Sequence, residues 1–480
     1  MSSLACFVHK PMHFSLLRDI TMSDEHHSGL LYGLEQRIPP LPAFFSALQH
    51  VLAGLVGIIT PPLIIGATLG LGDWLPYLIS MSLLASGIGT FLQSNRVWGI
   101  GAGMICMQGT SFAFLGVTVA GGMWVKAQGG GPQDMMAMLF GVNFVAALVP
   151  VIVSRFIEPL KKIFTPIITG SVIALIGISL IKVSVINWCG GEKAEDFASM
   201  SNIALGAGTL GVIVLLSCAK NRWLRLSSVV VGIAVGCIAA GLSGQFHLHS
   251  LGDTLFRLPT LFPFGFQFNS AIFLPVALVS LVCILEAVGD LTANSLISQQ
   301  SVDDRAFRNR LKGGILADGV SCMVAAMLCA FPNTTFAQNN GVIQMTGVAS
   351  RYVGRYIGVI LILLGLFPPV GELLRQIPAP VLGGATMVMF GCVVAAGIRI
   401  ITQTPLSRRD VLIVGLAFGA GLGVESVPAF LSHFPPMVGD LFGSAATSGG
   451  LVAIALNLIL PQEQAATKSL RSQDDRAESV

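Results

Sequence analysis

The sequence predicts an all-α polytopic membrane protein with about fourteen transmembrane segments, arranged as two inverted repeats of seven. Three observations lead to this fold class. The 480 residues are 53% hydrophobic and only 11% charged, whereas soluble proteins average about 25% charged residues. Apolar segments recur along the whole chain, and basic residues gather in every second connection between them. The 55 glycines suit closely packed or broken membrane helices.

The apolar segments fall into two sets of seven, separated by a polar connection at 244–270 that we expect outside the cytoplasm. A spanning helix needs about 20 apolar residues, so the shorter segments, such as 334–349, suit half-helices better. The first set, within 43–243, covers about 43–69, 74–94, 98–122, 135–157, 164–186, 203–219 and 227–243. The second set, within 271–460, covers about 271–295, 312–331, 334–349, 353–371, 379–400, 409–427 and 445–460.

A pattern of proline and glycine is shared by the two sets. The matching residues are Pro166, Gly170 and Gly177 in the fifth segment and Pro380, Gly384 and Gly391 in the twelfth. Because seven is odd, the two halves would cross the membrane in opposite directions, as in many secondary transporters. Three residues can match by chance in so glycine-rich a chain, and the pattern therefore only supports the inverted repeat.

The distribution of Lys and Arg predicts the orientation. If the tail 1–42 is cytoplasmic, the basic residues on the outer side are Lys126, Lys182, Lys193, Arg257 and Arg375. All others then fall on the inner side, an alternation that a wrong number of segments would have scrambled. We therefore expect both termini, including the tail 461–480, in the cytoplasm. Met22 is an alternative start to Met1.

The sequence disfavours several other classes of function. The nine cysteines stand singly, with no CxxC or Cys/His cluster, so neither a disulfide framework nor a metal site is expected. There is no GxxxxGK[ST] loop for ATP-driven transport, and a net charge of +3 does not indicate nucleic-acid binding. No nucleophile–base pair supports an intramembrane enzyme. We expect the function to lie in the membrane segments.

The most unusual stretch is 336–349, where Gln338, Asn339 and Asn340 precede Gly341 between long apolar segments. A regular helix in lipid satisfies its own backbone, so three consecutive side-chain amides indicate a backbone that opens around a polar ligand at membrane depth. The alternative is a loop outside the membrane, where Gln-Asn-Asn-Gly would be ordinary turn chemistry. The alternation of basic residues favours the first interpretation.

The eighth segment carries two acids, Glu286 and Asp290, four residues apart and so on one face of a helix. Loss of hydration and mutual repulsion inside a membrane favour protonation of at least one of them. Such a group can carry a proton or hold a cation-coupled site. The alternative is that these carboxylates only brace neighbouring helices.

Two further ionisable residues lie in apolar segments. Asp318 precedes Gly319 early in the ninth segment and could either relay protons or cap a broken helix. His50 lies in the first segment, and a lone buried histidine is more often a structural hydrogen-bonding group than a proton carrier. We therefore expect a structural role for His50.

The third segment contains Gln108-Gly109-Thr110-Ser111-Phe112, at about the place that the amide-rich stretch holds in the second half. Two broken helices meeting at mid-membrane would point backbone N–H groups at a ligand between them. Phe112 or Phe114 could stack on a flat ring, or simply pack. Amides and carboxylates without a nearby arginine favour a small neutral or weakly acidic ligand over a phosphate or a sugar acid.

These motifs resemble a known family. Residues 338–348, QNNGVIQMTGV, are similar to the highly specific signature of the nucleobase–ascorbate transporters, also called nucleobase:cation symporter-2. Residues 285–290, LEAVGD, and 312–319, KGGILADG, resemble the family's motifs in helices eight and nine. The resemblance covers about residues 30–462 in the same order and points to the bacterial xanthine permeases within the family.

The resemblance implies a core domain of segments 1–4 and 8–11 that holds substrate against a gate domain of segments 5–7 and 12–14. It also implies proton-coupled uptake across a bacterial inner membrane by a homodimer, driven by the proton gradient without a cofactor. By motif position, Glu286 and Gln338 resemble the purine-binding pair, and Ser111 and Phe112 would complete the substrate site. The supporting polar residues would be Asp318, Asp290, Asn339 and His50.

Ser111 departs from the pattern, because some xanthine permeases carry asparagine at this place. We therefore expect a proton symporter for xanthine, with uric acid or uracil as alternatives within the family. An anion exchanger of the same architecture is the alternative from another class. It would require a basic or neutral site instead of Glu286 with Gln338.

Overall fold

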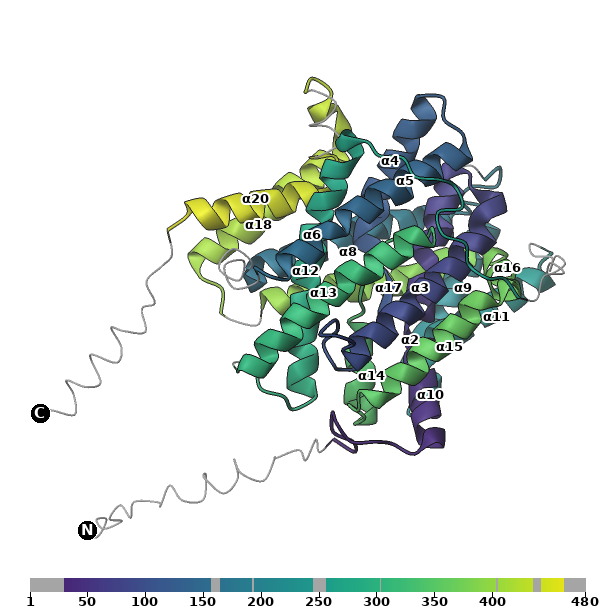
Figure 1. Cartoon of the computed structure of the whole chain (residues 1–480). Coiled ribbons are helices and arrows are strands. Elements are labelled where there is room, and N and C mark those ends of the chain that lie inside the picture. The colour runs from purple at the N-terminus through teal and green to yellow at the C-terminus, as the bar shows by residue number, and fades with distance from the viewer. Residues whose placement is uncertain are drawn as a thin grey trace, which may run out of the picture.

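The computed structural model describes residues 30–156, 165–191, 194–244, 256–302, 304–402, 405–434 and 442–461. Met22, Lys193 and most of both predicted tails lie outside the described residues. Helices dominate, and the named strands form one two-stranded sheet. Figure 1 shows the helices gathered into one body, with α18 and α20 running side by side at one edge.

The first half of the described chain contains twelve elements. They are α2 (Pro40–Leu69), η1 (Gly72–Trp74), α3 (Leu75–Asn95), β1 (Gln108–Thr110), η2 (Phe112–Phe114), α4 (Leu115–Ala127), α5 (Pro132–Ala146), α6 (Leu148–Val153), α8 (Pro166–Trp188), α9 (Met200–Ser217), α10 (Arg222–Leu226) and α11 (Ser228–Leu242).

The second half follows the connection that was expected at 244–270. Its elements are α12 (Ser270–Ile297), α13 (Arg305–Met327), β2 (Asn333–Thr335), α14 (Gln338–Thr346), α15 (Tyr352–Leu366), α16 (Pro368–Arg375), α17 (Ala379–Ile401), α18 (Arg408–Ser426), η3 (Pro428–Leu431) and α20 (Ala445–Ile459).

The prediction of a polytopic, mainly helical membrane protein is confirmed. Seven helices of the described part are long and apolar enough to span a membrane, or eight if α15 and α16, bent by 77°, form one span. Every expected apolar segment coincides with a helix or with an interrupted helix, although the total of fourteen spans stays a prediction. The third and tenth segments are the interrupted ones, since β1 and β2 replace helix there.

The shared proline–glycine pattern corresponds to equivalent prolines in α8 and α17, but its glycines pack differently, and a Cβ atom at Gly391 would meet nothing within 4 Å. Pro166 and Pro380 lie in the first turns of these helices, where a missing N–H costs nothing. At Gly170 a Cβ atom would lie 2.7 Å from the carbonyl oxygen of Gly397, so glycine permits the two backbones to approach. Gly384 instead packs against Gly206 of α9.

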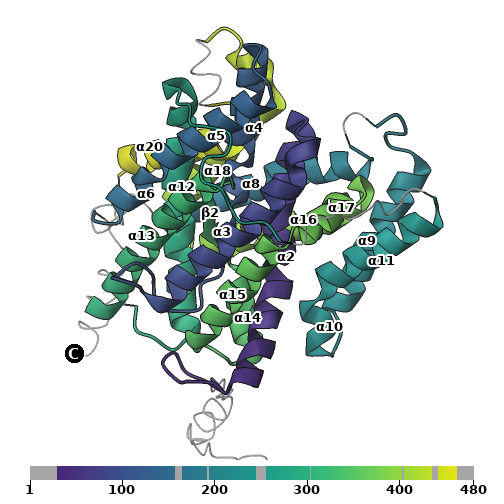
Figure 2. The same cartoon turned by 45° about the vertical axis from the view of Figure 1, so that its right-hand side comes forward.

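Two groups of helices pack mainly among themselves. In one group α3 packs against α2, α13, α15 and α16. In the other group α17 packs against α8 and α9, and α8 also packs against α20. Figure 2 shows α9, α10 and α11 together on one side of the molecule. Contacts of α12 with α8 and of η2 with α12 lie where the groups meet, and the candidate site is found there.

Candidate functional site

The two interrupted segments cross at the centre of the site. β1 and β2 pair antiparallel, with Gln108 opposite Thr335 and Thr110 opposite Asn333. Helical structure resumes immediately afterwards, at η2 in one segment and at α14 in the other. Because extended backbone at membrane depth must find partners, each strand satisfies the other. The N-terminal, partially positive ends of both half-helices therefore lie beside the crossing.

Glycine makes the crossing compact. A Cβ atom at Gly109 would overlap the ring of Phe336, and one at Gly57 of α2 would lie 2.7 Å from the same ring. The ring thus fills the space between α2 and β1. Bulkier residues at either position would force the strands or α2 apart.

Side-chain amides satisfy the backbone next to the crossing. The carbonyl oxygen of Ile105 accepts hydrogen bonds from Nδ2 of Asn339 and from Nδ2 of Asn294, the latter at 2.7 Å. The backbone N–H of Gln108 donates to Oγ1 of Thr90. The expectation that Asn339 holds opened backbone agrees with this contact.

Asp318 is buried on α13 and is held by two amides. Its Oδ1 accepts from Nε2 of Gln93 at 2.8 Å and from Nε2 of Gln108 at 2.7 Å. Gln93 also accepts from the backbone N–H of Ala102. Asp318 therefore links α13 to α3 and to the segment that contains β1. This role is wider than the expected alternative of capping one broken helix.

Asp290 of α12 faces the tenth segment. Its Oδ2 accepts from Oγ1 of Thr335, and its backbone carbonyl accepts from Nδ2 of Asn340, both at 3.3 Å. Asp290 thus anchors α12 to β2 and α14, which makes its role at least partly structural.

Glu286 and Gln338 differ from these residues. Both side chains are half-buried, and within the described part of the chain neither makes a hydrogen bond. Glu286 lies close enough to Asp318 and Asp290 for their charges to interact. Glu286 lies within the continuous helix α12, and Gln338 is the first residue of the half-helix α14. An unbonded carboxylate and an unbonded amide can each hydrogen-bond a ligand.

A cavity of about 920 Å³, comparable in size to ligand pockets in general, lies in the same region, but neither Glu286 nor Gln338 is among the described residues that line it. Its wall includes Leu285 and Ala337, the chain neighbours of Glu286 and Gln338. Polar lining comes from Asp290, Asn340 and Gln344. Arg399 of α17 also lines the cavity, so the expectation of a site without a nearby arginine is wrong for this cavity.

A second cavity, of about 320 Å³, lies at the other end of α12. Phe112 lines it, and the Phe112 ring meets the ring of Phe390 on α17 edge to face, with centroids 5.2 Å apart. Glu425 also lines this cavity, where its Oε2 accepts from Ser179 and from the backbone N–H of Ala445. Phe112 therefore takes part in an aromatic contact between the two groups of helices.

Ser111 and His50 are buried in the core. Oγ of Ser111 caps η2 by accepting from the N–H of Ala113, and it lies 3.6 Å from Sγ of Cys283. The ring of His50 lies beside the side chain of Asn339. In the described part of the chain, neither ring nitrogen of His50 reaches good hydrogen-bond geometry.

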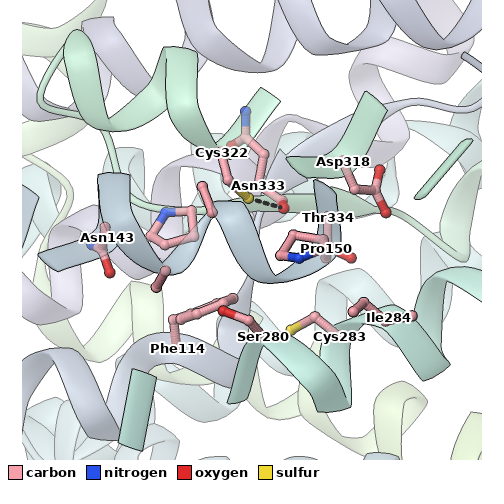
Figure 3. A pocket seen from close by; sticks show the side chains of 13 residues that line it. Phe114, Asn143, Pro150, Ser280, Cys283, Ile284, Asp318, Cys322, Asn333 and Thr334 are labelled. Atoms are coloured by element: carbon pink, nitrogen blue, oxygen red, sulfur yellow. Dashed lines mark hydrogen bonds between the residues drawn. The ribbon is translucent and has the colours of Figure 1, made fainter. Parts of the chain in front are cut away.

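A small cavity of about 20 Å³, the size of one water, lies beside Asp318. Figure 3 shows Asp318, Asn333 and Thr334 on one side of it and Ser280 and Cys283 on the other. Sγ of Cys322 donates to the backbone carbonyl of Asn333, the dashed line in the figure. Ile284 of α12 lines both this cavity and the larger one.

The structure brings the predicted residues of α12, α13 and α14 into one region, with Ser111 and Phe112 at its edge. Sequence reasoning missed Gln93, Asn294 and Thr335. Gln93 and Asn294 were detectable in principle, since each is an amide within an otherwise apolar segment. Only the crossing of β1 and β2 gives Thr335 its place beside Asp290.

Comparison with known protein families gives a match over residues 42–430 to a model described as a permease family. The chain is 43% identical to xanthine permease XanQ of Escherichia coli (strain K12), over 92% of this chain and 96% of that protein. It is 41% identical to XanP of the same organism, over 92% and 97%. It is 33% identical to uric acid permease PucJ of Bacillus subtilis (strain 168), over 86% and 92%.

Solved structures extend the comparison to the fold. The transmembrane domain of the cyanobacterial bicarbonate transporter BicA matches with a TM-score of 0.57 and 14% identity, covering 89% of this chain and 99% of that one. Murine Slc26a9, an anion transporter in its inward-facing state, matches with a TM-score of 0.59 and 11% identity, covering 95% and 76%. Both share the inverted-repeat architecture expected here.

Proposed function

The chain belongs to the nucleobase–ascorbate transporter family of permeases, and on that premise we propose that it is a proton-coupled symporter that imports xanthine. It is a multi-pass membrane transporter and not an enzyme. Xanthine is preferred over uric acid in this proposal because the two xanthine permeases share more identity with the chain than PucJ does.

One observation carries the proposal. Around the crossing, the side chains of Asp318, Asp290 and Asn339 are engaged in hydrogen bonds, whereas those of Glu286 and Gln338 make none to the residues that the structure describes. An ionised carboxylate accepts from purine N–H groups, and an amide can donate to a ring carbonyl while accepting from another N–H. Three acids in this region, against Arg399 in the cavity wall, disfavour an anion exchanger because the net negative charge would repel its substrate.

The proposed setting is a bacterial inner membrane with both termini in the cytoplasm. In that orientation the cavity of about 920 Å³ faces the cytoplasm, since it lies at the ends of α12 and α17 and the start of α8. The Phe112–Phe390 contact then lies on the outer side of the site. A homodimer completes the proposal by family membership.

Uptake of radiolabelled xanthine into cells, competed by a panel of purines and pyrimidines, tests the substrate. Proton coupling is tested in liposomes, where xanthine should drive proton entry measured with a pH-sensitive dye. Stronger competition by uric acid than by xanthine would overturn the assignment of xanthine as the preferred substrate. Xanthine flux without proton movement would overturn the proposed proton coupling.

Substitutions at Gln338 and at Asn339 are expected to impair purine uptake in different ways. Gln338→Glu removes a donor and places another acid near Glu286, so it should change both the pH profile of uptake and the ranking of purine analogues. Asn339→Ala removes the hydrogen bond to Ile105 and should lower uptake without changing that ranking. Analogues modified at single ring positions provide the measurement. Identical rankings for wild type and Gln338 variants would remove Gln338 from the site.

Ser111→Asn is expected to narrow the substrate range toward xanthine. The larger side chain brings two more donors to the edge of the site, while the position beside Cys283 leaves little room behind it. Competition profiles of the variant and of Ser111→Ala should therefore differ. An unchanged profile in both would mean that the third segment does not contact the purine ring.

A further inference from the structure

An unbalanced cluster of arginines surrounds Tyr352 at the start of α15. The guanidinium carbons of Arg37, Arg351 and Arg355 lie 5.6, 5.3 and 4.9 Å from the centre of its ring. Among the described residues one carboxylate joins them, Glu35, whose Oε2 accepts from Nε of Arg351 at 2.8 Å. Within that part of the chain three positive charges thus face one negative charge. Arg37 and Arg355 are exposed, and Nε of Arg355 donates to Oδ1 of Asn95.

The cluster lies at the end of an exposed apolar surface. Arg355, Val359 and Leu363 recur every four residues and so share one face of α15, on which Val359 is 47% and Leu363 60% exposed. The neighbouring helix α2 begins with exposed Leu41 and Phe44. Figures 1 and 2 both show α2, α14 and α15 side by side.

In a protein of this class such an apolar surface faces acyl chains, so the arginines at its end lie at headgroup depth. Guanidinium groups bind phosphate oxygens in pairs, which suits a phosphate better than any neutral headgroup. A bound phosphate would also relieve the repulsion among the three arginines. On the predicted orientation this is the cytoplasmic leaflet, the side on which anionic lipids attract basic clusters.

We propose that Arg37, Arg351 and Arg355 form a binding site for the headgroup phosphate of an anionic phospholipid whose acyl chains lie along α15 and the start of α2. This site is separate from the substrate site and does not depend on which purine is transported.

The site is connected to the substrate region through the segment 30–37. The backbone N–H groups of Leu31 and Tyr32 donate to the carbonyl of Gly347, and the N–H of Arg351 donates to the carbonyl of Leu34. This segment therefore pairs with the connection that follows α14, the half-helix bearing Gln338. A lipid phosphate bound by both Arg37 and Arg355 would hold the segment 30–37 against the connection that follows α14.

Native mass spectrometry of the full-length protein with phosphatidylglycerol or phosphatidylcholine tests the proposal. Wild type should retain phosphatidylglycerol preferentially, and each of Arg37→Gln and Arg355→Gln should weaken retention about fivefold. Arg375→Gln, at an exposed arginine on the predicted outer side, is the matched control and should leave retention unchanged. Glu35→Gln removes the opposing charge and should strengthen it.

Three results would overturn the proposal. Equal loss of phosphatidylglycerol in the Arg375 control would mean general charge attraction. Equal stabilisation of the protein by inorganic phosphate in phosphatidylcholine nanodiscs would mean a site for the free ion and not for a lipid. A change in oligomeric state in the arginine variants, with lipid retention unaltered, would mean that this face joins two copies of the chain.

Discussion

Replacing Glu286 with glutamine is expected to abolish xanthine uptake while the protein still inserts into the membrane. The variant keeps the shape of the side chain but removes its charge and replaces one acceptor oxygen with a donor. A lost hydrogen bond to a charged group costs about 1.5–3 kcal/mol, or roughly 10- to 150-fold in affinity. If Glu286 also carries the coupled proton, accumulation against a gradient should disappear completely.

The fold should survive this change because Glu286 makes no hydrogen bond to the described residues. Initial rates of labelled xanthine uptake, normalised to the amount of protein in the membrane, provide the measurement. Glu372→Gln is the control, since among the described residues the ion-pair partner of this carboxylate is Arg375, near the surface of α16. Wild-type uptake with unchanged pH dependence in the Glu286 variant would remove this residue from the site.

Two substitutions of Asp318 are expected to separate its contribution to folding from its contribution to transport. Asp318→Asn retains an oxygen that can accept from both Gln93 and Gln108, so the variant should fold, yet it cannot hold a negative charge or exchange a proton. Asp318→Leu leaves the Gln108 amide without that partner in the core, and each such unsatisfied donor costs about 1–3 kcal/mol. Both variants should lose uptake, but only the leucine variant should lose stability.

Thermal unfolding of the purified variants, together with uptake in cells, distinguishes the two effects. An asparagine variant with normal uptake would limit Asp318 to a structural role. An asparagine variant that unfolds as readily as the leucine variant would mean that the charge itself is needed for the fold.

Much of the fold could be predicted because membrane helices depend on local composition. Apolar length set the positions of α2, α8, α12 and α17, since a segment in lipid must satisfy its own backbone. The shortness of 334–349 and its cluster of amides indicated an interrupted helix. The same amides and the acids Glu286 and Asp290 indicated the chemical character of the site.

Tertiary structure decided the pairing of β1 with β2 and the contact of Phe112 with Phe390. It also decided which partner each buried polar side chain finds. Gln93 and Asp318 are 225 positions apart in the chain, yet they form one hydrogen bond. The local sequence pattern identified five polar residues inside apolar segments but did not distinguish their roles. They are Asp318, Asp290, Asn339, Glu286 and Gln338. Only the folded chain distinguished three that are held by distant partners from two that make no hydrogen bond to the described residues, because hydrogen bonds between remote segments are decided by packing and not by sequence spacing.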